Sequence, residues 1–142
     1  MSVQIRHLLD TNFISETRKP RPDLGVLNFL KSNDPNSAFI SILTLGELRK
    51  GVAAKRLRDP DADTAARLAE WADGLELSFA DRILGIDTAT AKLWGEWSAE
   101  RPRPVVDTLL AATAVLNDLT LVTRNLRDVR GIPVKLLDPW KA

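Results

Sequence analysis

The sequence predicts an α/β fold in which a mostly parallel central sheet of about five short strands lies between two layers of helices. Short, continuous apolar blocks alternate along the chain with longer segments of helical periodicity. Such blocks are typical of parallel strands, because helices cover both faces of a parallel sheet. Polar residues directly follow several blocks, at the strand ends where ligands bind in sheets of this kind.

The first half of the chain contains two predicted strands, 5–9 and 38–42, each a short apolar block. Helices are predicted over 12–17, over 22–31 with Pro22 near the start, and over 44–55. A longer helix over 60–77 has apolar residues at three- and four-residue spacing: Ala65, Leu68, Ala69, Ala72 and Leu75. The proline-containing segments 18–22 and 59–63 are predicted loops.

The second half begins with a predicted strand over 82–86, followed by a helix that Asp87 caps and that reaches about Glu100. A helix over 104–116 contains the almost wholly apolar run "TLLAATAVL", so we expect it to be deeply buried, with its start inside the fold. Strands 119–123 and 134–137 complete the sheet.

Composition limits the possible classes of protein. The chain has 142 residues, of which 44% are hydrophobic, which fits one globular domain over residues 1–142. It has no cysteine and one histidine, His7, so a metal here would be a hard cation held by carboxylates, such as Mg²⁺ or Mn²⁺. The start lacks a signal-peptide pattern, and the longest charge-free run, residues 35–46, has 12 residues. We therefore expect a soluble cytoplasmic protein without a membrane segment.

Basic residues are clustered although the net charge is only +1. Five lie between Leu48 and Arg58 with no acid among them, and others follow at Arg101, Arg103, Arg124, Arg127 and Arg130. Solvated helix faces and cations at helix C-termini would explain each cluster taken alone. Phosphate binding is the alternative, and it gains weight if the clusters flank a site. The tryptophans allow base stacking, although Trp94 and Trp97, at helical spacing, favour core or interface packing.

Three acids stand at strand ends or helix starts, and each has a purely structural explanation. Asp10 ends the block "IRHLL" and would be an ordinary N-cap. Thr44 and Glu47 have the spacing of a capping box, in which the glutamate folds back on the cap residue's amide. Asp107 lies in the first turn of a helix, where the dipole favours an acid.

Taken together, the three acids favour a metal site. Carboxylates gathered at one sheet edge repel one another, and a divalent cation reverses that penalty. A further strand end, at "LTLVTRN", offers the neutral oxygens of Thr123 and Asn125, with Asp128 one helical turn later. A polar turn would also explain that segment.

The segments "LLDTNFISE", "ISILTLGELRKGV", "PVVDTLLAATAVLNDLTLVTRN" and "VKLLDPW" resemble the PIN-domain ribonucleases, and among them the VapC and FitB type of toxin from type II toxin–antitoxin pairs. The resemblance runs from Ile5 to Trp140, with the segments in the family's order and spacing. It implies a PIN-like three-layer α/β/α fold.

The resemblance also implies a set of functional residues. Asp10, Glu47 and Asp107 match the family's acids, and Thr123 matches its hydroxyl. Many members carry a fourth acid where this chain has Asn125, which leaves open whether Asp128 substitutes for it. Thr11 and Asn12 would shape the turn and hydrogen-bond a carboxylate.

The implied activity is cleavage of RNA with one or two Mg²⁺ or Mn²⁺ ions bound by Asp10 and Asp107, while Glu47 would either bind the metal or orient the attacking water. Basic residues beside the acids would bind RNA phosphates: Arg49, Lys50, Arg101, Arg103 and Arg124. The implied partners are a small antitoxin that blocks the site and a second copy of the chain, with toxin–antitoxin hetero-oligomers as a further possibility.

Two other classes of protein are alternatives to a PIN-domain ribonuclease. Phosphatases of the haloacid dehalogenase type need a second aspartate two residues after the first, where this chain has Asn12, and a receiver domain needs a lysine where it has Arg124. A degenerate PIN domain that binds RNA or a partner without cleavage is the other alternative, which Asn125 favours and the three acids oppose.

Overall fold

Five parallel strands form one sheet in the computed structural model, which describes residues 4–61 and 63–141. The strands are β1 (His7–Leu9), β2 (Ala38–Ser41), β3 (Ile83–Leu84), β4 (Thr120–Val122) and β5 (Leu136–Leu137). Their order across the sheet is β3-β2-β1-β4-β5, and every pair is parallel. The α/β fold with about five short strands is thus confirmed. Residue 62 of the predicted loop 59–63 lies outside the described residues.

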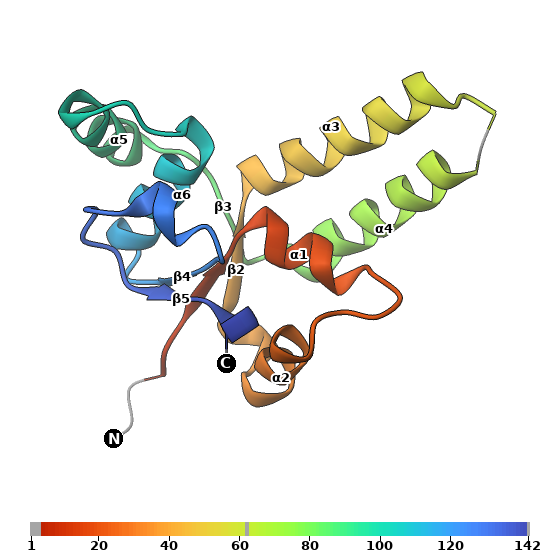
Figure 1. Cartoon of the computed structure of the whole chain (residues 1–142), viewed down its shortest axis with the longest axis horizontal. Helices are drawn as coiled ribbons and strands as arrows, with labels where there is room; N and C mark the ends of the chain where they lie inside the picture. Colours follow the sequence, from red (N-terminus) through yellow and green to blue (C-terminus); the bar gives the residue numbers. More distant parts are fainter. Residues whose placement is uncertain (1–3, 62, 142) are drawn as a thin grey trace.

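Six α-helices flank the sheet in the described part of the chain: α1 (Thr11–Thr17), α2 (Leu24–Ser32), α3 (Ile42–Arg58), α4 (Thr64–Ser78), α5 (Thr88–Glu100) and α6 (Val105–Leu116). Short 3-10 turns lie at Pro35–Ser37, Leu126–Val129 and Pro139–Lys141. Figure 1 shows α3 and α4 as a hairpin on one side of the molecule and α5 with α6 on the other. No helix among the described residues is long and apolar enough to cross a membrane.

Alternating side chains of the central strands divide the core into two. Leu8 packs with residues of α5 and α6, whereas its neighbour Leu9 packs with residues of α1 to α4. In β4, Leu121 packs in the same cluster as Leu8, and Val122 packs in the same cluster as Leu9. Because successive strand residues point to opposite faces, one sheet joins both helix layers, which gives the predicted three-layer architecture.

The predicted helix boundaries agree with the structure to within a few residues, and side-chain caps explain several of them. Asp10 accepts a hydrogen bond from the Phe13 amide at 2.8 Å, and Asp87 caps α5 through Thr90. The capping box of Thr44 and Glu47 is wrong. The helix begins earlier, at Ile42, because the Ser41 hydroxyl accepts from the Leu43 amide at 3.0 Å, so both residues lie inside α3.

The expectation for α6 holds only in part. Its middle is buried, from Leu110 to Ala114, but its start is open to solvent, with Val105 55% exposed. No side chain caps this end. The first turn of α6 therefore faces a surface pocket rather than the interior.

Two polar strand ends meet at the middle of the sheet. The chain leaves β1 toward β2 on one side, while β4 lies on the other side of β1. Leu9 pairs with Val122, so Asp10 and Thr123 follow directly at adjacent strand ends. Ligands bind where the strand order reverses in this way, which makes the end of β1 the expected site.

Candidate active site

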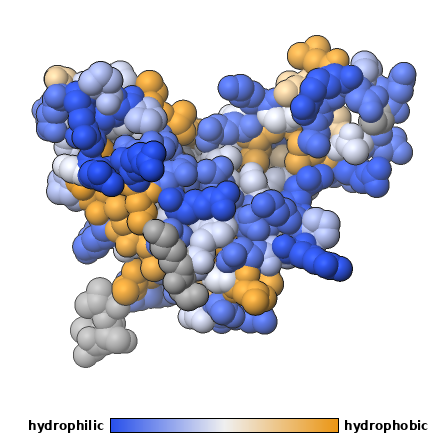
Figure 2. Space-filling model, in the orientation of Figure 1, coloured by the Kyte–Doolittle hydropathy of each residue, from blue (hydrophilic) through white to orange (hydrophobic). Residues whose placement is uncertain are grey.

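The acids predicted to act together line one pocket of about 360 Å³. It lies beyond the carboxyl ends of the strands, between α6 on one side and α1 with α3 on the other. Its wall consists of Asp10, Thr11, Asn12, Glu47, Pro104, Val105, Val106, Asp107, Leu110 and Asn125. Figure 2 shows the outline of the molecule notched between the helix pairs that flank it.

Asp10 is the most enclosed of the acids, with 3% of its surface exposed. Burial raises its pKa, and the charge of Glu47 acts in the same direction. Hydrogen bonds from the Thr123 hydroxyl and the Phe13 amide lower the pKa, as does the charge of Arg124. Asp10 thus serves as the α1 cap through one oxygen while its carboxylate borders the pocket.

Glu47 is hydrogen-bonded to the Thr11 hydroxyl at the start of α1. The Thr11 hydroxyl lies 2.5 Å from Glu47 Oε1 and 3.1 Å from the hydroxyl of buried Thr44. A hydroxyl has one proton to donate, so Thr11 donates to Glu47 and accepts from Thr44. Thr44 therefore supports the site through the Thr11 hydroxyl. The capping box predicted for Thr44 did not indicate this role.

Among the acids of the site, Asp107 has the most strongly shifted pKa. Its pKa is raised to about 6, first by burial and then by Asp128, with smaller contributions from the charges of Asp10 and Glu47. Asp128, on the turn after β4, is hydrogen-bonded to Asp107. Asn125 also lines the pocket, and its backbone N–H donates to the Thr123 hydroxyl at 2.9 Å. The chain thus brings a fourth acid to the site from Asp128.

The donor set fits a hard divalent cation that keeps most of its waters. All the groups are oxygens, and besides burial the charges of Asp128, Asp10 and Glu47 each act to raise the pKa of Asp107. Within 4–61 and 63–141, no three acidic or histidine groups are close enough to hold one ion directly. Mg²⁺ needs only one or two carboxylates and retains several waters, which the open pocket accommodates.

The predicted RNA-binding residues differ in where the structure places them. Arg124 acts on Asp10 and stands over the Trp140 ring at 4.9 Å, and Arg101 and Arg103 line a second pocket that shares Pro104 with the first. Arg49 instead pairs with Asp73 and Glu76 of α4. Lys50 is exposed on α3.

Two other sequence interpretations concern the core. His7 is 4% exposed and meets Phe29 of α2 edge-on at 4.9 Å, so it is structural as expected. Trp97 belongs to the core beside α6, whereas Trp94 is half-buried.

A parallel α/β sheet with an acidic pocket at the carboxyl ends of its strands defines the class of protein: an α/β domain with a carboxylate site. The family model described as "PIN domain" matches residues 7–131, and the chain belongs to this family.

Curated relatives align over nearly the whole chain. Toxin FitB of Neisseria gonorrhoeae is 31% identical over 138 residues, which are 94% of this chain and 97% of FitB. Plasmid stability protein StbB of Pseudomonas syringae pv. tomato is 28% identical, covering 95% and 99%. VapC ribonuclease Y4jK of Sinorhizobium fredii is 27% identical, covering 94% and 97%.

Solved structures show the same likeness. FitAcB from Neisseria gonorrhoeae matches with a TM-score of 0.83 at 30% identity, covering 95% of this chain and 99% of the other. FitAB bound to an IR36 DNA fragment matches with a TM-score of 0.82 at 29% identity, covering 94% of each chain.

Proposed function

We propose that this protein is a divalent-metal-dependent endoribonuclease and the toxin of a toxin–antitoxin pair. The main support is the convergence of Asp10, Glu47 and Asp107 on one pocket of a PIN domain. The names of its relatives, a toxin and a VapC ribonuclease, support the same activity.

Each acid has a distinct task in this proposal. Asp10 and Asp107 hold one or two Mg²⁺ or Mn²⁺ ions, Asp10 with its carboxylate oriented by the Phe13 amide and the Thr123 hydroxyl. Glu47, oriented by Thr11, positions the attacking water. The bound cation would supply charge neutralisation at the phosphate and lower the pKa of a water. Asp128 completes the acidic site in place of the acid that Asn125 replaces.

The proposed partners follow from the same likeness. A small antitoxin would cover the pocket, and the chain would form homodimers that assemble with it. The solved structures named FitAB and FitAcB support the complex with a second protein. Size-exclusion chromatography with light scattering, on the chain alone and co-expressed with the protein encoded next to it, tests this part.

The test of the activity is cleavage of pooled single-stranded RNA by the partner-free protein, with Mg²⁺, with Mn²⁺ and with EDTA. Asp10→Asn and Asp107→Asn are the inactive variants, and Asp61→Asn, an exposed loop acid, is the matched control. Metal-dependent cutting by wild type and control alone would establish the proposal. RNA binding without cutting at any metal concentration would favour a binding module instead.

A further inference from the structure

A second pocket, of about 230 Å³, adjoins the acidic one. Its wall contains four arginines and one acid: Arg101, Pro102, Arg103, Pro104, Arg127, Asp128 and Arg130. The positive charges come from two places in the chain, the segment before α6 and the turn after β4. An excess of guanidinium groups around one hollow is the arrangement that binds phosphate oxygens through paired N–H donors.

Two of the arginines are fixed in place by the backbone. Arg101 and Arg103 both donate to the carbonyl oxygen of Arg130, the latter at 3.1 Å. Arg103 also donates to the Trp97 carbonyl at 3.2 Å, and its side chain is only 3% exposed. A carboxylate oxygen of Glu100 lies 3.4 Å from the Arg103 guanidinium. Two like charges held side by side gain from an anion that both can reach.

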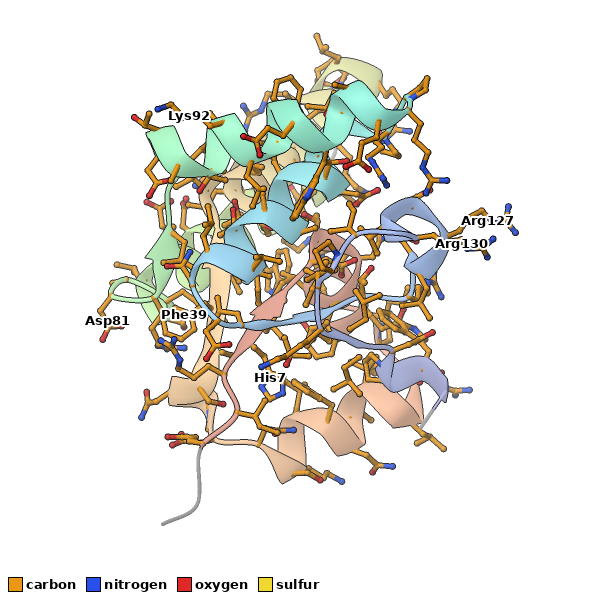
Figure 3. All side chains as sticks on the ribbon, turned by 90° about the vertical axis from the view of Figure 1, so that its left-hand side faces the viewer. His7, Phe39, Asp81, Lys92, Arg127 and Arg130 are labelled. Carbon is orange, nitrogen blue, oxygen red and sulfur yellow. The ribbon has the colours of Figure 1, made fainter. Side chains whose placement is uncertain are left out.

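The other two arginines are free to meet a ligand. The side chains of Arg127 and Arg130 are exposed and have no recorded partner among residues 4–61 and 63–141. Figure 3 shows both projecting outward on the same side of the molecule, from the turn after β4. The pocket thus combines a hydrogen-bonded pair with an exposed pair, and a bound phosphate would be within reach of both.

The arginine pocket lies next to the acidic pocket. Pro104 lines both, and Asp128 of the arginine pocket is hydrogen-bonded to Asp107 of the acidic one. A single strand of RNA with one phosphate at the acids would therefore pass its neighbouring phosphates over the arginines. The acids alone repel such a strand, so a cationic neighbour is needed to retain it.

We propose that the pocket formed by Arg101, Arg103, Arg127 and Arg130 binds a backbone phosphate of single-stranded RNA, adjacent to the phosphate that is cut. This inference rests on the proposed ribonuclease function and assigns its substrate a second contact. An acidic protein segment is the competing occupant, and the experiment below separates the two.

The test compares the double variant Arg127→Ala/Arg130→Ala with Arg56→Ala/Arg58→Ala. The first pair removes two exposed charges and leaves the Arg130 carbonyl in place. The control pair removes the same charge from the end of α3, at the opposite end of the molecule (Figure 1). Binding of randomised short RNA is measured by fluorescence anisotropy with Mg²⁺ in an Asp10→Asn background, so that the RNA stays intact.

We expect the pocket variant to bind RNA about 10-fold more weakly, and the slope of log affinity against log salt to fall by roughly 1.4, about 0.7 for each lost contact with a single strand. Arg127→Lys/Arg130→Lys should retain most of the salt dependence, since lysine keeps the charge. The control variant should behave as the Asp10→Asn parent.

Several outcomes would overturn the inference. One is an unchanged affinity and salt slope in the pocket variant, and another is an equal loss in the control. A third is loss of antitoxin binding with RNA binding intact, which would assign the pocket to a protein segment. Cleavage by wild type is measured separately. If wild type cuts RNA and the pocket variant still binds RNA normally, only this inference is wrong. Weakened RNA binding without any cutting by wild type defeats only the cleavage proposal.

Discussion

The Thr11 hydroxyl donates to Glu47 Oε1 across 2.5 Å and so joins the first turn of α1 to the second turn of α3. Glu47 is exposed and lies on a helix that begins after β2, whereas Thr11 follows β1. The bond gives the glutamate one orientation toward the pocket. Thr44, buried beneath both, holds the hydroxyl in turn.

We predict that Thr11→Val lowers the RNA-cleavage rate by about 10- to 100-fold, as loss of a supporting hydrogen bond to a metal-site carboxylate commonly does. Thr11→Ser, which retains the hydroxyl, should keep most of the rate. Both rates are measured at saturating Mg²⁺. A Thr11→Val enzyme as fast as wild type would show that this bond does not orient Glu47 for the reaction.

Asp10→Asn should separate the two tasks of Asp10. Asparagine caps helices as well as aspartate, so the melting temperature in EDTA should not fall. Asp10→Ala also loses the cap, which costs about 1 kcal/mol relative to Asn. Neither variant should cleave RNA, and neither should be stabilised by Mg²⁺ as wild type is. Thermal melts with and without Mg²⁺ decide this, and Mg²⁺ stabilisation of Asp10→Asn equal to that of wild type would contradict the ligand role.

Asp107→Asn should stabilise the metal-free protein at neutral pH while abolishing cleavage. The folded-state pKa of Asp107, about 6, lies above its ordinary value of 3.8. The folded state therefore binds more protons than the unfolded state between these values, and stability falls as pH rises through that window. The asparagine side chain does not titrate, so Asp107→Asn does not lose stability in this pH window. Melts in EDTA at about pH 4 and pH 8 test the sign: the advantage of Asp107→Asn should be present only at the higher pH.

Asp128→Asn should lower the pKa of Asp107, because Asp128 both hydrogen-bonds to Asp107 and repels its charge. The pH at which wild type loses stability would then shift downward in the variant. A carboxyl NMR titration in EDTA follows Asp107 directly, with Asp61→Asn as control. An unchanged Asp107 titration in Asp128→Asn would mean that burial and the charges of Asp10 and Glu47 raise the pKa without Asp128.

Gly25→Ala should destabilise the chain. A methyl group at Gly25 would lie 2.0 Å from the Pro139 carbonyl oxygen, where α2 meets the C-terminal turn. Overpacking of this kind costs about 1 to 3 kcal/mol. The matched control, Gly74→Ala in α4, meets nothing within 4 Å and should gain roughly 0.5 to 1 kcal/mol of helix stability. Urea unfolding of both variants provides the comparison.

The elements of this fold and the main acids of its site follow from local patterns in the sequence. Apolar blocks and helical periodicity are properties of neighbouring residues, and so is the cap that Asp10 provides. Parallel strands then bring their carboxyl ends to one edge, so the gathering of Asp10 with Thr123 was predictable from the fold class. The same reasoning placed Glu47 and Asp107 with Asp10, and the family resemblance matched all three to the family's acids.

Other features depend on residues that only the tertiary structure brings together. Nothing near Glu47 in the sequence indicates that Thr11 orients it, and the local pattern favoured a cap at Thr44 that Ser41 provides instead. Asp128 reaches Asp107 because the turn after β4 packs beside α6, and the same packing gathers the arginines of the second pocket. Arg49 is drawn away from the site by acids of α4. Local sequence determines which groups stand at each strand end, and long-range packing decides which of them touch.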